Sequence, residues 1–219
     1  MKQIFFLAVA LFAASNALLA QTASTQPYYP LNIGDKWTYR HVDLKVIPNK
    51  GDAPKRTTVE VERQEIYEQK AAKESKDPKA NVINRVGFIL KNSSGGKTTR
   101  DHVVVLEDGV YRVTAAGTAM TPPLRFFPFF KDQEREIQVN TVCGNEVVKG
   151  TISGRRDKVT VPAGKFDAVA VLFTNNKKEE FERVEVETWF VEKIGMVKQR
   201  ILQKGHEHAL ELETYAPKK

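Results

Sequence analysis

Cysteine is almost absent from this chain of 219 residues, which has a single one, Cys143. No internal disulfide can form, so the fold must stand on its own hydrophobic core. A lone Cys beside a Gly is most often a small buried apolar residue. No His with Asn or Asp lies in a context that would make Cys143 a nucleophile. The sequence therefore excludes a disulfide scaffold and predicts no cysteine-based catalysis.

Long apolar runs are lacking after residue 20, and long runs of Lys or Arg are lacking throughout. The chain has 34 Lys and Arg against 27 Asp and Glu, a formal net charge of +7. This excess is mild and lacks the clusters typical of nucleic-acid binding. A segment that crosses a bilayer needs roughly 20 apolar residues. We therefore expect no nucleic-acid partner and no transmembrane segment.

The first twenty residues have the layout of a secretory signal peptide. A basic start at Lys2 precedes an apolar run over 4–12, and small residues continue to Ala20. No Cys lies near this end, so we expect no bacterial lipid anchor. The sequence predicts an exported protein of the periplasm or outer surface. Its predicted organisation is a signal peptide at 1–20, a disordered lead-in at 21–29 and a single antiparallel β domain at 30–217.

The dominant pattern in the rest of the chain is an alternation of apolar and polar residues with a period of two, which indicates strands. Short loops between them imply an antiparallel meander, and so large a sheet must curl or close to protect its edges. The predicted fold class is all-β: one strongly curved antiparallel meander that forms a closed or half-open barrel. Strands are predicted near 35–47, 56–68, 82–91, 97–107, 110–116, 134–142, 146–159, 166–175, 180–192, 196–204 and 207–215.

The segment 117–133 breaks this alternation and contains three Pro and four Phe residues. The Pro residues, Pro122, Pro123 and Pro128, rule out a central strand and predict a loop. Four Phe in a loop must cover an apolar surface, because exposing them to water is unfavourable. They are Phe126, Phe127, Phe129 and Phe130.

The stretch Gly95-Gly96-Lys97-Thr98 follows an apolar run, as the end of a phosphate-binding loop does. That loop requires a Gly five positions before its second Gly, and residue 91 is Lys instead. A helix must also follow, since its N-terminus holds the phosphate, yet the pattern after Thr98 is that of a strand. The sequence therefore favours the tip of an antiparallel hairpin over a nucleotide site.

Two further groups are candidates for chemistry. His206 and His208 would face the same way on a strand, as a metal-binding pair does, but they lack a third ligand, so solvent-facing His residues are favoured. Glu185 and Glu187 could serve glycoside hydrolysis, yet a Glu-rich strand is usually a polar face that pairs with Lys and Arg across the sheet. We expect no cofactor, no metal and no enzymatic activity.

Three blocks in the chain carry a family resemblance: YYPLNIGDKWTYR at 28–40, VTVPAGKFDAVAV at 159–171 and ETWFVEKIGMVKQ at 187–199. Together they resemble a group of secreted bacterial β proteins of unknown function, often labelled TapB-like. That group is similar in architecture to the LolA-type half-barrels of the cell envelope. The resemblance implies a curved sheet and no agreed activity. It is weaker in the middle, where residues 131–136 replace the Gly and Trp usually found in the group.

Aromatic side chains are the remaining indication of function. They either form the core, with the Pro- and Phe-rich segment as its plug, or line a concave surface for an apolar or lipid-like ligand. We predict a non-enzymatic binding or accessory protein of a bacterial envelope. The alternative is a structural partner of an envelope or secretion complex, which would use a sheet edge or basic surface without a small ligand. The candidate ligand-binding residues are Trp37, Tyr39, Phe126, Phe127, Phe129, Phe130 and Trp189.

Overall fold

The computed structural model describes residues 28–44, 54–70, 82–129 and 136–218. The predicted signal peptide at 1–20 and the candidate Phe130 lie outside these ranges. The described residues form twelve strands: β1 (Lys36–Asp43), β2 (Arg56–Lys70), β3 (Val82–Ser94), β4 (Lys97–Leu106), β5 (Gly109–Ala115), β6 (Thr118–Pro128), β7 (Glu136–Cys143), β8 (Glu146–Val161), β9 (Gly164–Thr174), β10 (Val184–Val191), β11 (Gly195–Gln203) and β12 (His206–Ala216).

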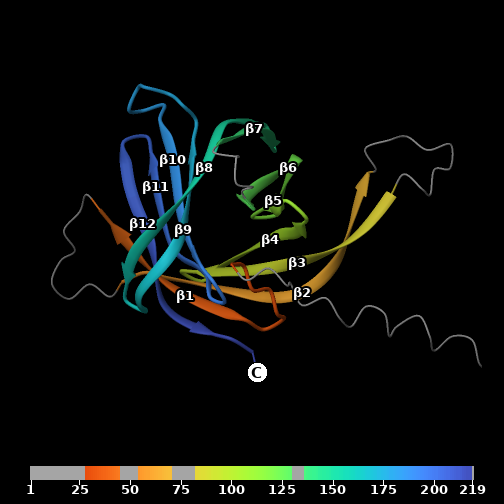
Figure 1. The fold of residues 1–219 in the computed structure, drawn as a ribbon, viewed down its shortest axis with the longest axis horizontal. Coiled ribbons are helices and arrows are strands. Elements are labelled where there is room, and N and C mark those ends of the chain that lie inside the picture. Colours follow the sequence, from red (N-terminus) through yellow and green to blue (C-terminus); the bar gives the residue numbers. More distant parts are fainter. Residues whose placement is uncertain (1–27, 45–53, 71–81, 130–135, 219) are drawn as a thin grey trace, which may run out of the picture.

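The twelve strands form one closed antiparallel barrel. Each strand pairs with its neighbours in the chain, and the first and last strands close the sheet through a register that runs from Lys36↔Ala216 to Asp43↔His208. In Figure 1, β8–β12 make one wall of the barrel and β1–β6 the wall that meets it. The prediction of an all-β antiparallel meander is confirmed, and the sheet is closed.

The Gly95-Gly96 pair makes a tight hairpin turn. Ser94 pairs with Lys97, so two residues connect β3 to β4, and both have positive φ, 54° for Gly95 and 78° for Gly96. Two successive residues with positive φ are typical of the type I′ turn that suits the twist of a hairpin. Lys97 is exposed and begins a strand, not a helix. The hairpin interpretation is therefore confirmed.

The prediction that the Pro residues exclude a strand from 117–133 is wrong, because most of this segment forms β6. Pro122 and Pro123 fall in an irregular part of the strand, between Ala119, which pairs with Thr114, and Leu124, which pairs with Arg112. The residues between these two pairs have no partner on β5, so the missing N–H groups of the two Pro residues break no hydrogen bond of that ladder. Local pairing thus accommodates residues that would disrupt a regular central strand.

The same two Pro residues mark a seam in the barrel, where β6 and β7 separate. These strands pair only at Met120↔Cys143 and Thr121↔Val142. The register ends at the residue before Pro122, since Pro has no N–H with which to continue the ladder. After Thr121, β6 pairs only with β5. Before Val142, β7 pairs only with β8.

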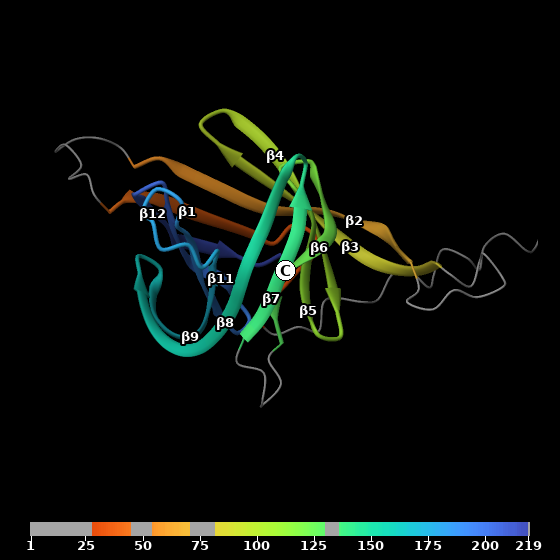
Figure 2. The same ribbon diagram turned by 90° about the horizontal axis from the view of Figure 1, so that it is seen from above.

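The β2–β3 hairpin extends beyond the barrel as an arm. The pairing of β2 with β1 stops at Glu60, whereas its pairing with β3 continues to Lys70↔Val82. Figure 2 shows this arm leaving the barrel wall as a two-stranded ribbon. Ile66, on the arm, is 57% exposed.

The N-terminal segment packs against one end of the barrel. The Tyr28 ring lies edge-on to Phe127, with ring centroids 6.2 Å apart, and the Tyr29 ring contacts those of Phe126 and Phe190 at 5.6 and 5.8 Å. Tyr28 and Tyr29, the last two residues of the predicted disordered lead-in at 21–29, are thus ordered, and residues 21–27 lie outside the described residues. Aromatic contacts bury their rings, which a disordered segment would leave in water.

Buried Asp35 fastens this segment in place. Its carboxylate accepts hydrogen bonds from the Asn32 backbone N–H at 3.1 Å and from the Lys218 backbone N–H at 2.9 Å. The turn before β1 is thereby joined to the residues that follow β12. We refer to the end of the barrel that this segment covers as the closed end.

Ion pairs run across the outer face of the barrel. Glu211 is 8% exposed and accepts hydrogen bonds from Arg40 at 2.7 Å and from Lys198 at 3.0 Å. Burial raises the pKa of Glu211, but the hydrogen bonds from Arg40 and Lys198 outweigh that effect, so the pKa lies below its usual value. Glu211 thus joins β12 to both neighbouring strands through ion pairs.

Candidate functional site in the barrel interior

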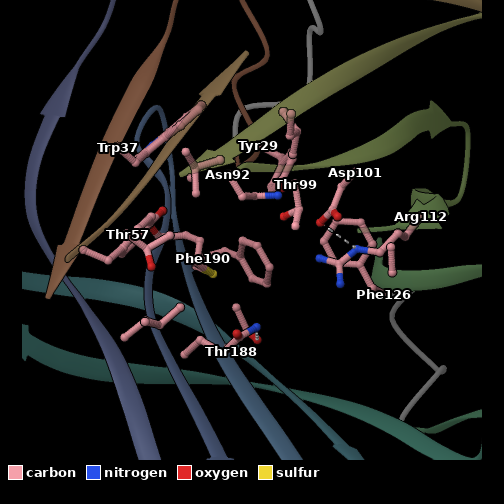
Figure 3. Close-up of a pocket in the computed structure, with 18 of the residues that line it drawn as sticks. Tyr29, Trp37, Thr57, Asn92, Thr99, Asp101, Arg112, Phe126, Thr188 and Phe190 are labelled. Atoms are coloured by element: carbon pink, nitrogen blue, oxygen red, sulfur yellow. Dashed lines mark hydrogen bonds and ion pairs between the residues drawn. The ribbon is translucent and has the colours of Figure 1, made fainter. Parts of the chain in front are cut away.

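The barrel interior contains a cavity with two adjoining lobes. The first, the mixed lobe, has a volume of about 380 Å³ and is lined by aromatic, hydroxyl, amide and charged side chains (Figure 3). The second, the aliphatic lobe, has a volume of about 260 Å³ and is lined mainly by Val, Ile, Leu and Phe side chains. Four residues line both lobes and define the junction between them: Arg112, Phe126, Thr188 and Gln199.

Aromatic residues form the wall of the mixed lobe toward the closed end. The indole N–H of Trp37 donates to the Ile194 carbonyl at 2.6 Å, and the Tyr39 hydroxyl donates to the Met196 carbonyl at 2.9 Å. The polar tips of both rings are therefore satisfied by backbone near the β10–β11 turn, and their apolar faces remain for the cavity. Burial raises the pKa of Tyr39 well above its usual value and that of Tyr29 to about 12, so both side chains stay neutral.

Arg112 is placed at the junction by β5. Val103↔Arg112 and His102↔Thr114 are consecutive pairs of β4 and β5, so Val113 is an extra residue in β5. A bulge of this kind changes the direction of nearby side chains. The Arg112 guanidinium lies over the Phe126 ring, with its central carbon 4.9 Å from the ring centroid. In Figure 3 its terminal nitrogens point into the cavity.

Asp101, on β4, is the charged neighbour of Arg112. The Arg112 Nε lies 3.7 Å from Asp101 Oδ2, a distance too long for a hydrogen bond. The other oxygen, Oδ1, accepts the Ala116 backbone N–H at 2.7 Å. The Arg112 Nε is buried and has no hydrogen-bond partner. The pair thus interacts through charge alone.

A neutral polar pair on the facing strands completes the junction. Thr188 and Gln199 pair directly across β10 and β11, and the Gln199 amide donates to the Thr188 hydroxyl at 3.2 Å. The junction therefore presents a guanidinium on one wall and an amide with a hydroxyl on another. Such a set can hydrogen-bond the polar end of a ligand whose apolar part lies beside it.

The structure brings together three of the seven sequence-predicted ligand-binding residues at the cavity. Trp37, Tyr39 and Phe126 line it. Phe127 is buried and stacks on Phe190, with ring centroids 4.2 Å apart, and Phe129 packs edge-on against Phe127. Phe127 and Phe129 therefore do not line the cavity but pack behind Phe190, which does.

Trp189 lies apart from this group, so the prediction that it shares one surface with the others is wrong. Its indole N–H donates to Asp157 at 3.0 Å, and Lys198 lies 5.8 Å from the centre of its ring. The neighbouring Phe190 lines the cavity. Because successive side chains of a strand point to opposite faces, Trp189 must face outward.

Four residues of the mixed lobe were not predicted from the sequence: Tyr29, Asp101, Arg112 and Phe190. A signal for Phe190 was available, since alternation allows only one member of Trp189-Phe190 to face inward. Arg112 lies two residues after the apolar Val110, so the two share a face of β5, and the side of the strand that Arg112 faces could have been inferred. No local pattern indicates that Tyr29 folds back onto the barrel.

The two other candidate groups do not contribute to the cavity. His206 is exposed and lies across from Gln203, and His208 is exposed as well. Within the described ranges, no group of three or more His, Cys, Asp and Glu side chains is arranged to hold a metal ion. Glu187 pairs with Arg155 at 2.5 Å, in agreement with the interpretation of Glu185 and Glu187 as part of a polar face that pairs with basic residues.

Comparisons with known proteins give limited information. No family model matches the chain, and no curated protein does. The chain is similar to a solved structure from Parabacteroides distasonis ATCC 8503, described as a lipoprotein, with 11% identity, a TM-score of 0.46 and coverage of 87% of this chain and 99% of the other. A second, from Bacteroides fragilis NCTC 9343, is described as an exported protein with a YmcC-like fold. It has 13% identity, a TM-score of 0.48 and coverage of 88% and 100%.

The resemblance to the TapB-like group gains no support from these comparisons and stays a prediction. Within the part of the chain that the structure describes, no helix is both long and apolar enough to cross a membrane.

Proposed function

We propose that this chain is an exported, non-enzymatic binding protein that holds an apolar or lipid-like ligand inside its barrel. The observation that carries the proposal is the aliphatic lobe of about 260 Å³, lined by side chains such as Ile152, Val171 and Phe173. Apolar walls with a few converging polar groups are typical of small-molecule sites. The signal peptide predicted at 1–20 would bring the chain to the compartment in which such a ligand is met.

The polar groups at the junction support binding over catalysis. The Gln199 amide and the Thr188 hydroxyl are bonded to each other, and Arg112 faces Asp101 across 3.7 Å. These groups can recognise and orient a ligand, whereas hydrolysis needs a nucleophile or a base aimed at a bound substrate. The proposed role is therefore to hold or carry a ligand.

The alternative is a structural partner of an envelope complex, and the β2–β3 arm favours it. Val61 still exchanges backbone hydrogen bonds with Gly34 and Asp35, but beyond it the described residues provide no backbone partner for β2 on the side away from β3. A free strand edge can add a strand from another protein. Measuring ligand uptake distinguishes the two functions, because a binding protein should take up a lipid, whereas a partner that uses only the arm need not.

Uptake of a lipid is the direct test. Protein purified from its own host, and protein incubated with a lipid extract, would be analysed by native mass spectrometry. We expect a mass shift of one acyl-chain ligand per barrel. A clean ligand-free mass after both treatments would contradict the proposal.

A matched pair of variants tests whether the ligand lies in the cavity. Val148 lines the aliphatic lobe, whereas its neighbour Val147 is 62% exposed. Val148→Phe places a ring where the chain of the ligand should lie. If it displaces about two methylenes at about 0.8 kcal/mol each, affinity falls about tenfold. Val147→Phe adds the same ring outside and should leave affinity unchanged; equal effects of the two variants would place the ligand elsewhere.

A further inference from the structure

The charge distribution of the cavity points to the class of ligand. Of the described residues that line either lobe, Arg112 is the only cation and Asp101 the only anion. Arg112 belongs to the junction that both lobes share, so a ligand in the aliphatic lobe would have its polar end beside the guanidinium. The following inference rests on the proposed function and specifies its ligand.

The hydrogen-bonding capacity of Arg112 is unused within the described residues. Its interactions are the 3.7 Å ion pair with Asp101, the contact with the Phe126 ring and a charge interaction with Tyr29. A guanidinium has five N–H donors in a planar fork that matches a carboxylate. Leaving such donors without partners in a partly buried site is unfavourable, so a ligand that accepts their hydrogen bonds would be favoured.

Asp101 limits the charge of the ligand. It gives the guanidinium a neutralising neighbour, but the Ala116 N–H draws one of its oxygens away from Arg112. One cation that is partly compensated by one carboxylate suits a single negative charge better than a double one. A carboxylate meets this condition and can accept two parallel N–H bonds from the fork.

The facing wall can hold the same head group. Gln199 uses one amide N–H for the Thr188 hydroxyl, at 3.2 Å, which leaves the second N–H of this amide and the hydroxyl proton of Thr188 as donors. Both residues line the junction with Arg112. Donors on two walls would therefore surround the head group, and the aliphatic lobe begins beside them.

From this geometry we infer that the barrel binds a long-chain carboxylate, with its head group paired to Arg112 and its alkyl chain in the aliphatic lobe. Arg112 is the residue that distinguishes such a ligand from a neutral lipid of the same length. A charged hydrogen bond of this kind corresponds to a preference of about ten- to a hundredfold.

Two ligands that differ only in the head group test this inference. Binding of palmitate and of methyl palmitate would be measured by displacement of a fluorescent probe from purified full-length protein. The wild type should prefer palmitate by about ten- to a hundredfold. Arg112→Gln should abolish that preference while keeping the binding of methyl palmitate, which also shows that the variant is folded.

Two further variants sharpen the test. Asp101→Asn removes the competing carboxylate and should increase the preference for palmitate. Arg112→Lys keeps the charge but loses the planar fork, so it should retain only part of the preference. An increase after Asp101→Asn together with a loss after Arg112→Gln would establish the role of Arg112.

The outcomes separate this inference from the proposed function. Equal affinity of the wild type for the acid and the ester, or a preference unchanged by Arg112→Gln, would overturn the assignment of Arg112 and leave a neutral-lipid site in place. Failure of both ligands to bind the wild type would count against the proposed function itself.

Discussion

Replacing Phe190 with alanine tests whether the aromatic residues at the closed end support both the barrel and its cavity. Phe190 is 1% exposed. Its ring stacks on Phe127 at a centroid distance of 4.2 Å and an interplanar angle of 23°, and it contacts the Tyr29 ring at 5.8 Å. The same side chain lines the mixed lobe. Its removal would therefore enlarge the cavity and detach the N-terminal segment from one of its supports.

The expected loss follows from these contacts. Truncation of a buried Phe to Ala costs about 3–5 kcal/mol, because apolar contacts are lost and a cavity remains. Each aromatic pair contributes about 0.5–1.5 kcal/mol of this loss beyond the buried area. Phe190→Leu keeps most of the apolar bulk and loses the two ring pairs, so it should cost about 1–3 kcal/mol. The order of stability should be wild type, Phe190→Leu, Phe190→Ala.

Urea unfolding followed by tryptophan fluorescence measures these differences in the free energy of unfolding. The differences are taken from the shift in urea midpoint multiplied by the common slope, because extrapolation to zero urea carries an uncertainty of about 10–15% of the whole free energy of unfolding. A loss below about 1 kcal/mol for Phe190→Ala would refute the reasoning, since it would mean that Phe190 is not packed as a core residue. Equal losses for the Leu and Ala variants would exclude a contribution from side-chain volume.

Three more predictions concern other parts of the barrel. The pKa of Glu211 is lowered in the folded state, so its contribution to stability is present above the unfolded pKa of about 4.3 and is lost as the pH falls through the folded value. Glu211→Gln should therefore flatten the acid side of the stability profile in urea titrations at several pH values. Gly96 has φ +78° and no atom within 4 Å of an added Cβ, so Gly96→Ala should cost about 1 kcal/mol through backbone strain alone, and an unchanged urea midpoint would contradict the turn geometry. Met120→Cys would place a thiol opposite Cys143, so that oxidation can close the β6–β7 seam with a disulfide. If ligands pass through this seam, the disulfide should slow uptake of a fluorescent fatty acid, and its reduction should restore the rate. Identical rates before and after reduction would exclude that route.

The strands could be predicted from the sequence because their signal is local. Alternation in stretches such as Val184–Val191 indicates a strand whatever the rest of the chain does. The Gly95-Gly96 turn is also local, since two adjacent Gly residues can both adopt positive φ. The prediction failed where the pairing partners of a segment decide whether it can form a strand. β6 tolerates Pro122 and Pro123 because its neighbours require no N–H there.

The site was only partly predictable, because its geometry depends on contacts between distant parts of the chain. Trp37 and Phe126 could be identified from the sequence because they are large aromatic residues, which either form a core or line a site. Tyr29 reaches the cavity through contacts with Phe126 and Phe190, which are far from it in sequence. The aim of Arg112 depends on the bulge at Val113, which appears only when β4 and β5 are placed in register.

The number of strands explains why this barrel has room for a ligand. About eight strands enclose an interior that side chains can fill, and the diameter of a barrel grows with the number of strands. With twelve strands, the closed end is filled by aromatic rings while a cavity remains elsewhere. A fold of this type does not by itself assign a function. The residues that line the cavity are more informative.

The Arg112 side chain is 30% exposed, but its Nε is buried and has no hydrogen-bond partner, which is unfavourable. The chain places this guanidinium between an aliphatic lobe and a facing amide. Local departures from favourable packing are expected where a protein binds or reacts. The unpartnered Nε of Arg112 is therefore a physical reason to expect a ligand with an acceptor group at this junction.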